Sequence, residues 1–539
     1  MSRQSNLTPE LDAVEAAIDK EHLKNRLTQL TFSEAAWYFL SFCEEMQFKR
    51  LEVDGVNSRQ DTATHVDQII NNMKTPLRWL RETCQPGTQI PRRYCDDSYG
   101  ASLELYKLAN DYGSFESAYI YARAGTATLE LQGDTVVPDI SVPQEPRYEA
   151  YDRLCIEEPS AFDEERARNF FESVTQTVTV SGERFRYQLN PGIVSHGLDT
   201  LSPLQNHFRL PKSWKLPRYT FGDFRSVVST LRVMAMIHHF ARMAAARQGC
   251  VRLGYVDSVL LMGREELSKR LKRYTGISIE IVNEIIRDFT FGARGIRNPD
   301  PAIQPLIALS ANHIAISPVL FLGIDIERNF TVLLNRLPEE KKAYSQLSNE
   351  RETISRRSII DRVKPLHLRF WHGVLPGRND LPDLDLAIID DTQKTCLVLE
   401  LKAFIGPAEP REILEKSEEI AKGVSQIIVL RDAFHAESVL LTEPLKIDGS
   451  YNVLFAVVSE TFVGRPGVQN ESVPVVRLDH LVRRLLAGAS LSSVCEWLRT
   501  RKYLPIEGTH FEVREIHASV GDWRLQWYGI KPSVNDSYL

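Results

Sequence analysis

The segment from Leu381 to Lys402 reads LPDLDLAIIDDTQKTCLVLELK and contains two apolar runs separated by a polar stretch. Leu384–Ile389 and Leu397–Leu401 have the length and aliphatic composition of buried strands. Asp390–Gln393 has the polar composition of a turn between them. The segment therefore predicts two adjacent strands joined by a short turn.

Three charged residues interrupt these apolar runs. Side chains alternate between the faces of a strand, so Glu400 and Lys402 share a face and Leu401 points the other way. Asp385 opens the neighbouring strand, so the three charges can meet. Two carboxylates and an ammonium are what a hard divalent cation and an activated water need. The alternative is a surface hairpin whose charges keep an edge soluble, although charge in an apolar strand is costly without a partner or a metal.

An acid on one strand followed by Glu-x-Lys on the next resembles the PD-(D/E)XK nuclease superfamily, which includes many restriction endonucleases. Asp385, Glu400 and Lys402 carry the resemblance, and even the literal Pro382-Asp383 is present. The resemblance covers roughly residues 340–460, and the rest of the chain resembles no family that we recognise. It implies a restriction-endonuclease-like αβββαβ core.

The flanking segments agree with that core, which runs helix, three strands, helix, strand. Pro338–Arg362 is a charged helical stretch with a proline at its start, and Leu366–Trp371 is suited to the first strand. Glu409–Asp432 has the apolar stripe of a helix. Val453–Val458 is a short apolar run suited to a buried strand.

The resemblance also implies site roles. Asp385, Glu400 and the carbonyl of Leu401 would hold Mg²⁺ or Mn²⁺, which takes oxygen ligands and keeps several waters. Lys402 would hold the attacking water or stabilise the phosphate. Gln426, four residues after Lys422 on one helix face, would orient the water or a phosphate. In branches that resemble Mrr and the NERD domain, a helix Gln near this point borders the active site.

Two assignments stay open. Asp383 and Asp385 share a strand face by parity, and either could be the principal metal ligand. We favour Asp385, which opens the apolar strand, with Asp383 as a second ligand or a capping residue. Glu350 and Glu352 lie on the preceding helix, where some superfamily members recruit an extra ligand, but a solvated helix face is the simpler interpretation of both.

Composition limits where a nucleic acid could bind. The 539 residues are 43% hydrophobic and 25% charged, as in ordinary globular proteins. The net charge of −6 excludes a generally basic nucleic-acid binder, so a basic footprint must be local. Arg356, Arg357, Arg369 and Lys422 are candidates to contact a phosphate backbone. A solvated helix followed by a strand explains the arginines equally well.

The cysteines and the apolar runs bear on location. The chain has seven cysteines, an odd number, and no Cys-x-x-Cys pair, which indicates a reducing compartment without disulfides or zinc. The first ten residues lack the apolar core of a signal peptide, and no apolar run reaches membrane-spanning length. We therefore expect a cytoplasmic protein without membrane association.

The chain as a whole is expected to have a mixed α+β fold of several domains. The expected segments are a helical N-terminal domain at 1–135, a mixed α/β middle region with hairpins at 136–335, the nuclease-like domain at 336–465 and a small C-terminal β-containing extension at 466–539. The N-terminal part would recognise a partner protein or a nucleic-acid feature. A homo-oligomer is expected, since double-strand cutting by this fold usually needs two active sites.

Two functions follow from these patterns. The first is a metal-dependent endonuclease that hydrolyses phosphodiester bonds, with DNA favoured as substrate. Its organisation resembles bacterial anti-phage defence and restriction effectors, which is an analogy from fold alone. The second is a non-catalytic nucleic-acid-binding or complex-assembly protein built on a degenerate nuclease fold. The intact Asp, Glu and Lys argue against decay, because an unused set of buried charges is costly.

Overall fold

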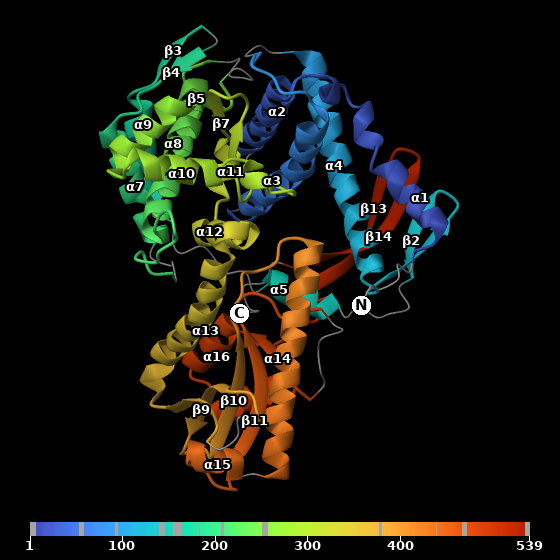
Figure 1. The fold of residues 1–539 in the computed structure, drawn as a ribbon, viewed down its shortest axis with the longest axis vertical. Coiled ribbons are helices and arrows are strands. Elements are labelled where there is room, and N and C mark those ends of the chain that lie inside the picture. Colours follow the sequence, from blue (N-terminus) through green and yellow to red (C-terminus); the bar gives the residue numbers. More distant parts are fainter. Residues whose placement is uncertain are drawn as a thin grey trace.

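The computed structural model shows a mixed α+β chain, with 56% of its residues in helices and 18% in strands, which confirms the expectation of a mixed α+β fold. Figure 1 shows a large, mostly helical body and a smaller part built around strands β9 to β11. The structure describes residues 7–52, 59–91, 95–139, 146–154, 164–182, 184–205, 210–250, 257–376, 380–437, 439–465 and 472–533.

The helical body is formed by most, but not all, of the first 336 positions. Its central helix, α8 (Phe221–Arg247), is buried on most of its surface, and His238, His239 and Arg242 are buried with its apolar side chains. The helices before it are α1 (Pro9–Ile18), α2 (Phe32–Glu52), α3 (Arg59–Thr83), α4 (Asp96–Arg123), α5 (Pro146–Leu154), α6 (Glu164–Thr175) and α7 (Pro191–Leu201). Those after it are α9 (Arg264–Thr275), α10 (Ile279–Asp288), α11 (Pro318–Leu322) and α12 (Ile326–Arg336).

Short strands complete this body. The first of the hairpins expected in the middle region is β3 (Thr179–Ser181) paired with β4 (Arg184–Arg186). The second expected hairpin is β6 (Leu306–Ala308) with β7 (His313–Ile316), and β5 (Leu260–Gly263) adds a third strand beside β7. Both hairpins are therefore confirmed.

A five-stranded mixed sheet forms the smaller part. Its order is β12-β11-β10-β9-β8, antiparallel from β8 to β10 and parallel from β10 to β12. The strands are β8 (Arg369–Gly373), β9 (Leu384–Asp390), β10 (Thr395–Lys402), β11 (Asn452–Ser459) and β12 (Val475–Arg477). Two long helices, α13 (Lys341–Val363) and α14 (Pro410–Ala436), flank β9 to β11 (Figure 1). A short helix, α15 (Val439–Leu445), precedes β11.

Each element predicted between residues 340 and 460 is present, with bounds that shift by a few residues. The first strand begins three residues later than predicted, at Arg369 and not at Leu366. A 3-10 turn at Lys364–Leu366 occupies the difference, and His367 after it has a positive φ of 56°. Strand geometry is impossible at such a residue, so the strand starts only beyond it.

The C-terminal residues divide between two sheets. β12, α16 (Leu478–Leu486) and α17 (Leu491–Arg499) complete the five-stranded sheet and its core. β13 (Phe511–Val520) and β14 (Trp523–Pro532) instead form a four-stranded sheet with β1 (Thr128–Gln132) and β2 (Thr135–Asp139). In that sheet Leu525 of β14 lies beside Val136 of β2 in a parallel pair. Packing therefore crosses the predicted boundaries at 135/136 and 465/466.

The middle segment also contributes to the smaller part. Tyr148 and Tyr151 of α5 belong to the same apolar cluster as β9, β10 and β11. The hydroxyl of Tyr151 lies 3.0 Å from Nδ1 of His480 in α16. The core around the five-stranded sheet is thus assembled from segments more than 300 residues apart in sequence.

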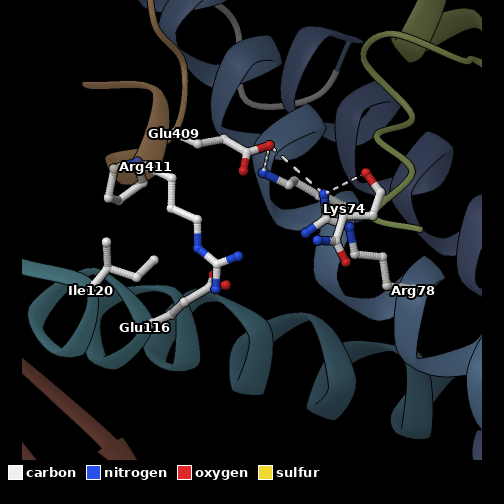
Figure 2. Close-up of a pocket in the computed structure, with 8 residues that line it drawn as sticks. Lys74, Arg78, Glu116, Ile120, Glu409 and Arg411 are labelled. Carbon is white, nitrogen blue, oxygen red and sulfur yellow. Dashed lines mark hydrogen bonds and ion pairs between the residues drawn. The ribbon is translucent and has the colours of Figure 1, made fainter. Parts of the chain in front are cut away.

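A cluster of charges joins α14 to the helical body. Glu409, the residue before α14, pairs with Lys74, lies 3.7 Å from Nη2 of Arg78 and 3.6 Å from Nη2 of Arg336. Figure 2 shows the Glu409 carboxylate directed at Lys74. Burial alone would raise the pKa of Glu409, but the three cations together hold it below its usual value. The first turn of α14 is therefore anchored to α3 and α12.

A pocket of about 100 Å³ lies at this junction, between α3, α4 and the start of α14. Lys74, Arg78, Glu116, Glu409 and Arg411 line it (Figure 2). Its cations and carboxylates largely serve one another, and none of its lining residues is among the predicted site residues. We interpret it as a gap in a charged interface.

Candidate active site

The pairing of β9 with β10 brings Asp385 to Glu400. The paired residues run from Thr395↔Asp390 to Leu399↔Leu386, and the next step of the same register sets Asp385 opposite Glu400. Directly opposed residues share a face of a sheet. The Leu401 N–H then donates to Asp385 Oδ2 over 2.7 Å. The structure thus places these two acids opposite each other at the end of the ladder.

Lys402 completes the cluster from the same face of β10. Its Nζ donates to Glu400 Oε1 over 2.7 Å and to Gln426 Oε1 over 3.0 Å. Gln426 reaches the site from α14, which packs against β10. Glu400 is only 3% exposed, so its charge needs this compensation. The structure thus gathers all four predicted catalytic side chains.

Burial and mutual repulsion perturb both acids. Burial, followed by the negative charge of Asp385, raises the pKa of Glu400 to about 7 against the opposing effect of Lys402. Burial also raises the pKa of Asp385, against the Leu401 N–H and the Lys402 charge. Two adjacent carboxylates whose charged forms are disfavoured make a site that a cation would stabilise.

Helix α13 contributes two further charges. The side chain of Glu352 is exposed at its surface. Desolvation by the surrounding protein, followed by the negative charge of Asp385, nevertheless raises the pKa of Glu352. Arg356, one turn later, acts in the opposite direction on the pKa of both Glu352 and Asp385. Glu352 therefore lies within electrostatic reach of the site, which a simple solvated helix face does not describe. Glu350 instead accepts a hydrogen bond from Nε1 of Trp214 in the helical body.

Glu460 is a neighbour of the site that sequence reasoning missed. It follows β11 and is 3% exposed, and its N–H donates to the Lys402 carbonyl over 3.1 Å. Its carboxylate accepts from Ser355 Oγ and lies 3.4 Å from Nη2 of Arg351. Glu460 thereby fastens α13 to the strand end beside Lys402. The only signal in the sequence was an acid one residue beyond the apolar run that ends at Val458.

The structure places the candidate nucleic-acid contacts at different distances from the site. Arg357 on α13 and Lys422 on α14 are exposed. Arg369 pairs with both oxygens of Asp391, at 3.0 and 2.7 Å, in the turn beyond β9. Asp391 is six residues from Asp385 along the chain, which is about 20 Å of strand. Arg369 is therefore a structural residue at the opposite end of β9.

Asp383, the alternative principal ligand, is exposed just before β9 begins. Its charge contributes to the raised pKa of Asp385, so the two carboxylates lie near one another. Asp385 is the one that is hydrogen-bonded to β10 and faces Glu400. This position favours Asp385 as the principal residue and Asp383 as an outer one.

The donor set can be compared with the needs of a divalent ion. Across the described ranges, no group of three or more His, Cys, Asp and Glu side chains has a metal-binding arrangement. Mg²⁺ needs only one or two protein carboxylates because it keeps several waters. The Lys402 carbonyl accepts the N–H of Glu460 on the side of β10 that faces β11. Backbone groups of successive strand residues point to opposite sides, so the Leu401 carbonyl points to the other side, where Asp385 accepts the Leu401 N–H. Asp385, Glu400 and this carbonyl fit such an ion.

No protein-family model, no curated protein and no solved structure matches the chain. The functional argument therefore depends on the residues and the geometry of the site. In the described part of the chain, no helix combines the length and the hydropathy that crossing a bilayer requires.

Proposed function

We propose that this protein is a metal-dependent endonuclease of the PD-(D/E)XK type that hydrolyses phosphodiester bonds, with DNA as its substrate. The observation that carries the proposal is the cluster in which Asp385 faces Glu400 while Lys402 bridges Glu400 and Gln426. These are the residue types that the superfamily motif requires, on the two strands where the motif places them.

The order of elements supports the same proposal. Along the chain, α13, β8, β9, β10, α14 and β11 follow the helix, three-strand, helix, strand order of the superfamily core. The two antiparallel steps and the parallel step to β11 place the ends of β10 and β11 together beside α14. We infer a restriction-endonuclease-like core from this order together with the motif.

In this proposal Asp385, Glu400 and the Leu401 carbonyl hold Mg²⁺ or Mn²⁺. When bound, the ion lowers the pKa of a water and offsets phosphate charge. Lys402 has three N–H donors, of which Glu400 and Gln426 accept two, so one is left for the water or a phosphate oxygen. The Gln426 amide group retains its own N–H donors for the same purpose.

The proposed substrate contacts lie on the two helices that flank the sheet. Arg356 and Arg357 are on α13, and Lys422 is on α14, so cations are available on both sides of the strand ends. Such contacts bind phosphates without reading base sequence. The same proposal includes a homo-oligomer, a cytoplasmic anti-phage or restriction role, and recognition of a partner by the helical body, all by analogy of fold.

One observation favours the alternative of a non-catalytic nucleic-acid-binding or assembly protein. Lys402 already neutralises Glu400, and the Leu401 N–H already serves Asp385, so the cluster is compensated without an ion. A charge network of this kind could serve only to hold β9, β10 and α14 together.

A nuclease assay on the full chain separates the two functions. Supercoiled plasmid, linear duplex, single-stranded DNA and RNA are incubated with wild type in Mg²⁺, Mn²⁺ or EDTA. We expect metal-dependent cleavage of DNA that Asp385→Asn, Glu400→Gln and Lys402→Ala each reduce by at least ~100-fold. Glu415→Gln, an exposed change on α14, is the matched control. Absence of cleavage together with absence of Mn²⁺ binding by calorimetry would support the non-catalytic alternative.

A further inference from the structure

We propose that Gly423 is a positioning residue for Lys402: the missing side chain at this point of α14 leaves the space through which the lysine reaches Glu400 and Gln426. The catalytic meaning of this role rests on the proposed nuclease function. Its structural part, a steric coupling between Gly423 and Lys402, does not depend on that function.

The geometry is tight. A Cβ built on Gly423 would lie 2.6 Å from Lys402 Cε, and 3.4 Å from the Cγ atoms of Lys402 and Glu400. Carbon atoms do not approach to 2.6 Å without a bond, because optimal contacts are near 3.5–4.0 Å. Gly423 is buried in the packing of α14 against β10. An alanine would therefore compete with Lys402 for the same space.

The local backbone conformation does not require a glycine at position 423. Gly423 lies in the interior of α14 and does not have a positive φ. It is the only glycine of this 27-residue helix. A glycine inside a helix loses more backbone entropy than an alanine would, so the residue is locally unfavourable. The close approach of Lys402 supplies the compensating reason.

Gly423 and Gln426 act on Lys402 together. Residues three apart are neighbours on one face of a helix, so the open space and the amide lie side by side. Gly423 admits the lysine stem, and Gln426 accepts its terminal N–H at 3.0 Å. The clashing atom is near the end of a flexible side chain, so an added methyl would displace Lys402 more readily than it would shift the helix. The displaced Nζ would lose its bonds to Glu400 and Gln426.

A double-mutant cycle tests the coupling without any nuclease assay. Gly423→Ala is made in the wild type and in Lys402→Ala, and the melting temperature of the full chain is measured. Gly113→Ala in α4 is the matched control, because, apart from its chain neighbours and the nearby backbone of its own helix, no heavy atom lies within 4 Å of the place that its Cβ would take. The control should raise the melting temperature in both backgrounds, by about 1–2 °C.

Gly423→Ala should raise the melting temperature only in the Lys402→Ala background, where the space is vacant. In the wild type it should leave the melting temperature unchanged or lower it. Equal increases in both backgrounds, matching Gly113→Ala, would overturn the proposal. Neither result depends on whether the protein cleaves DNA, so failure here is distinct from failure of the proposed function.

The activity assay adds a measurement that a purely structural role of Gly423 would leave unchanged. Gly423→Ala should lower kcat by about tenfold while KM stays within about twofold, because a misplaced cation weakens the transition state more than binding. Gly113→Ala should leave both constants unchanged. If Gly423→Ala cleaves DNA with wild-type kcat, the positioning role is excluded even where the melting temperatures show coupling.

Discussion

The backbone N–H of Leu401 donates a 2.7 Å hydrogen bond to Oδ2 of Asp385, at the point where the ladder between β9 and β10 ends. The carboxylate thus takes the place of a backbone acceptor and ties the start of one strand to the end of the other. Because Leu401 lies between Glu400 and Lys402, this bond holds Asp385 beside both. The site is built into the sheet and does not depend on a loop.

A divalent ion should stabilise the fold through these acids. We expect Mn²⁺ to raise the melting temperature of the wild type, with a gain of about 2.7 kcal/mol at a hundredfold excess over Kd. Glu400→Gln should abolish the rise because it removes one ligand, and EDTA should reverse it. Thermal unfolding against Mn²⁺ concentration measures the effect. An undiminished rise in Glu400→Gln, with Glu415→Gln as control, would place the ion elsewhere.

Two of the arginines predicted to contact a phosphate backbone, Arg356 and Arg369, should differ in their effect on DNA binding. Arg356 is near Asp385, so Arg356→Ala should weaken duplex DNA binding and reduce the dependence of log K on log salt by about one unit. Arg369 is committed to Asp391 and to the Leu445 carbonyl, so Arg369→Ala should leave binding unchanged and cost about 1 kcal/mol of stability. Fluorescence anisotropy over a salt series, beside thermal unfolding, distinguishes them. The opposite pattern would contradict the site assignment.

The anchor of α14 should be a stability determinant. Glu409→Gln leaves Lys74, Arg78 and Arg336 without their shared carboxylate, which should cost about 1–3 kcal/mol. Glu415→Gln on the exposed face of α14 should cost almost nothing. Chemical unfolding of both variants measures the difference. Equal free energies of unfolding in Glu409→Gln and Glu415→Gln would mean that other groups compensate the charges of Lys74, Arg78 and Arg336.

This anchor also has a predictable pH dependence. The pKa of Glu409 is lowered in the folded protein, so the folded state releases its proton more readily than the unfolded state. The stabilisation that the charged Glu409 gives to the folded state is therefore complete above the ordinary pKa of 4.5. It is lost as the pH falls through the lower pKa that Glu409 has in the folded protein. The stability gap between wild type and Glu409→Gln should narrow on acidification below about pH 4.5.

A buried histidine should make the helical body sensitive to acid. His238 is 4% exposed, with Nδ1 2.9 Å from the Tyr187 hydroxyl and Nε2 2.8 Å from the Asp257 carbonyl. Burial, followed by the charge of Arg242, lowers its pKa to about 3. The unfolded chain takes up this proton below about pH 6.5 and the folded chain does not, so stability is complete above that pH and falls below it.

The measurement is the stability gap between wild type and His238→Gln as a function of pH. The gap should shrink by about 2 kcal/mol between pH 7 and pH 5, because the variant lacks the proton uptake. His435→Gln, an exposed change on α14, is the control for the substitution of a histidine by glutamine. A constant gap in His238→Gln would mean that the histidine takes up its proton equally in the folded and unfolded states.

Much of the candidate site could be predicted because its signals are local. The two apolar runs, the turn between them and the alternation of faces placed Glu400 and Lys402 on one side of a strand. The apolar stripe of α14 also placed Gln426 on a helix that packs on the sheet. By contrast, Glu460 lies beside Lys402 only because β10 and β11 pair with Lys402 next to Ser459. Such a register depends on contacts distant in sequence.

The sequence by itself determined the elements between residues 340 and 460 and the chemistry of Asp385, Glu400 and Lys402, because hydrophobic period and residue type act over a few neighbouring positions. Only the tertiary structure decided that Glu352 lies near Asp385, that Gly423 makes room for Lys402, and that β14 returns to pair with β2. These relationships depend on how helices and strands from distant segments pack together. Burial of apolar surface drives that packing, and it is non-directional, so no local pattern specifies the partners.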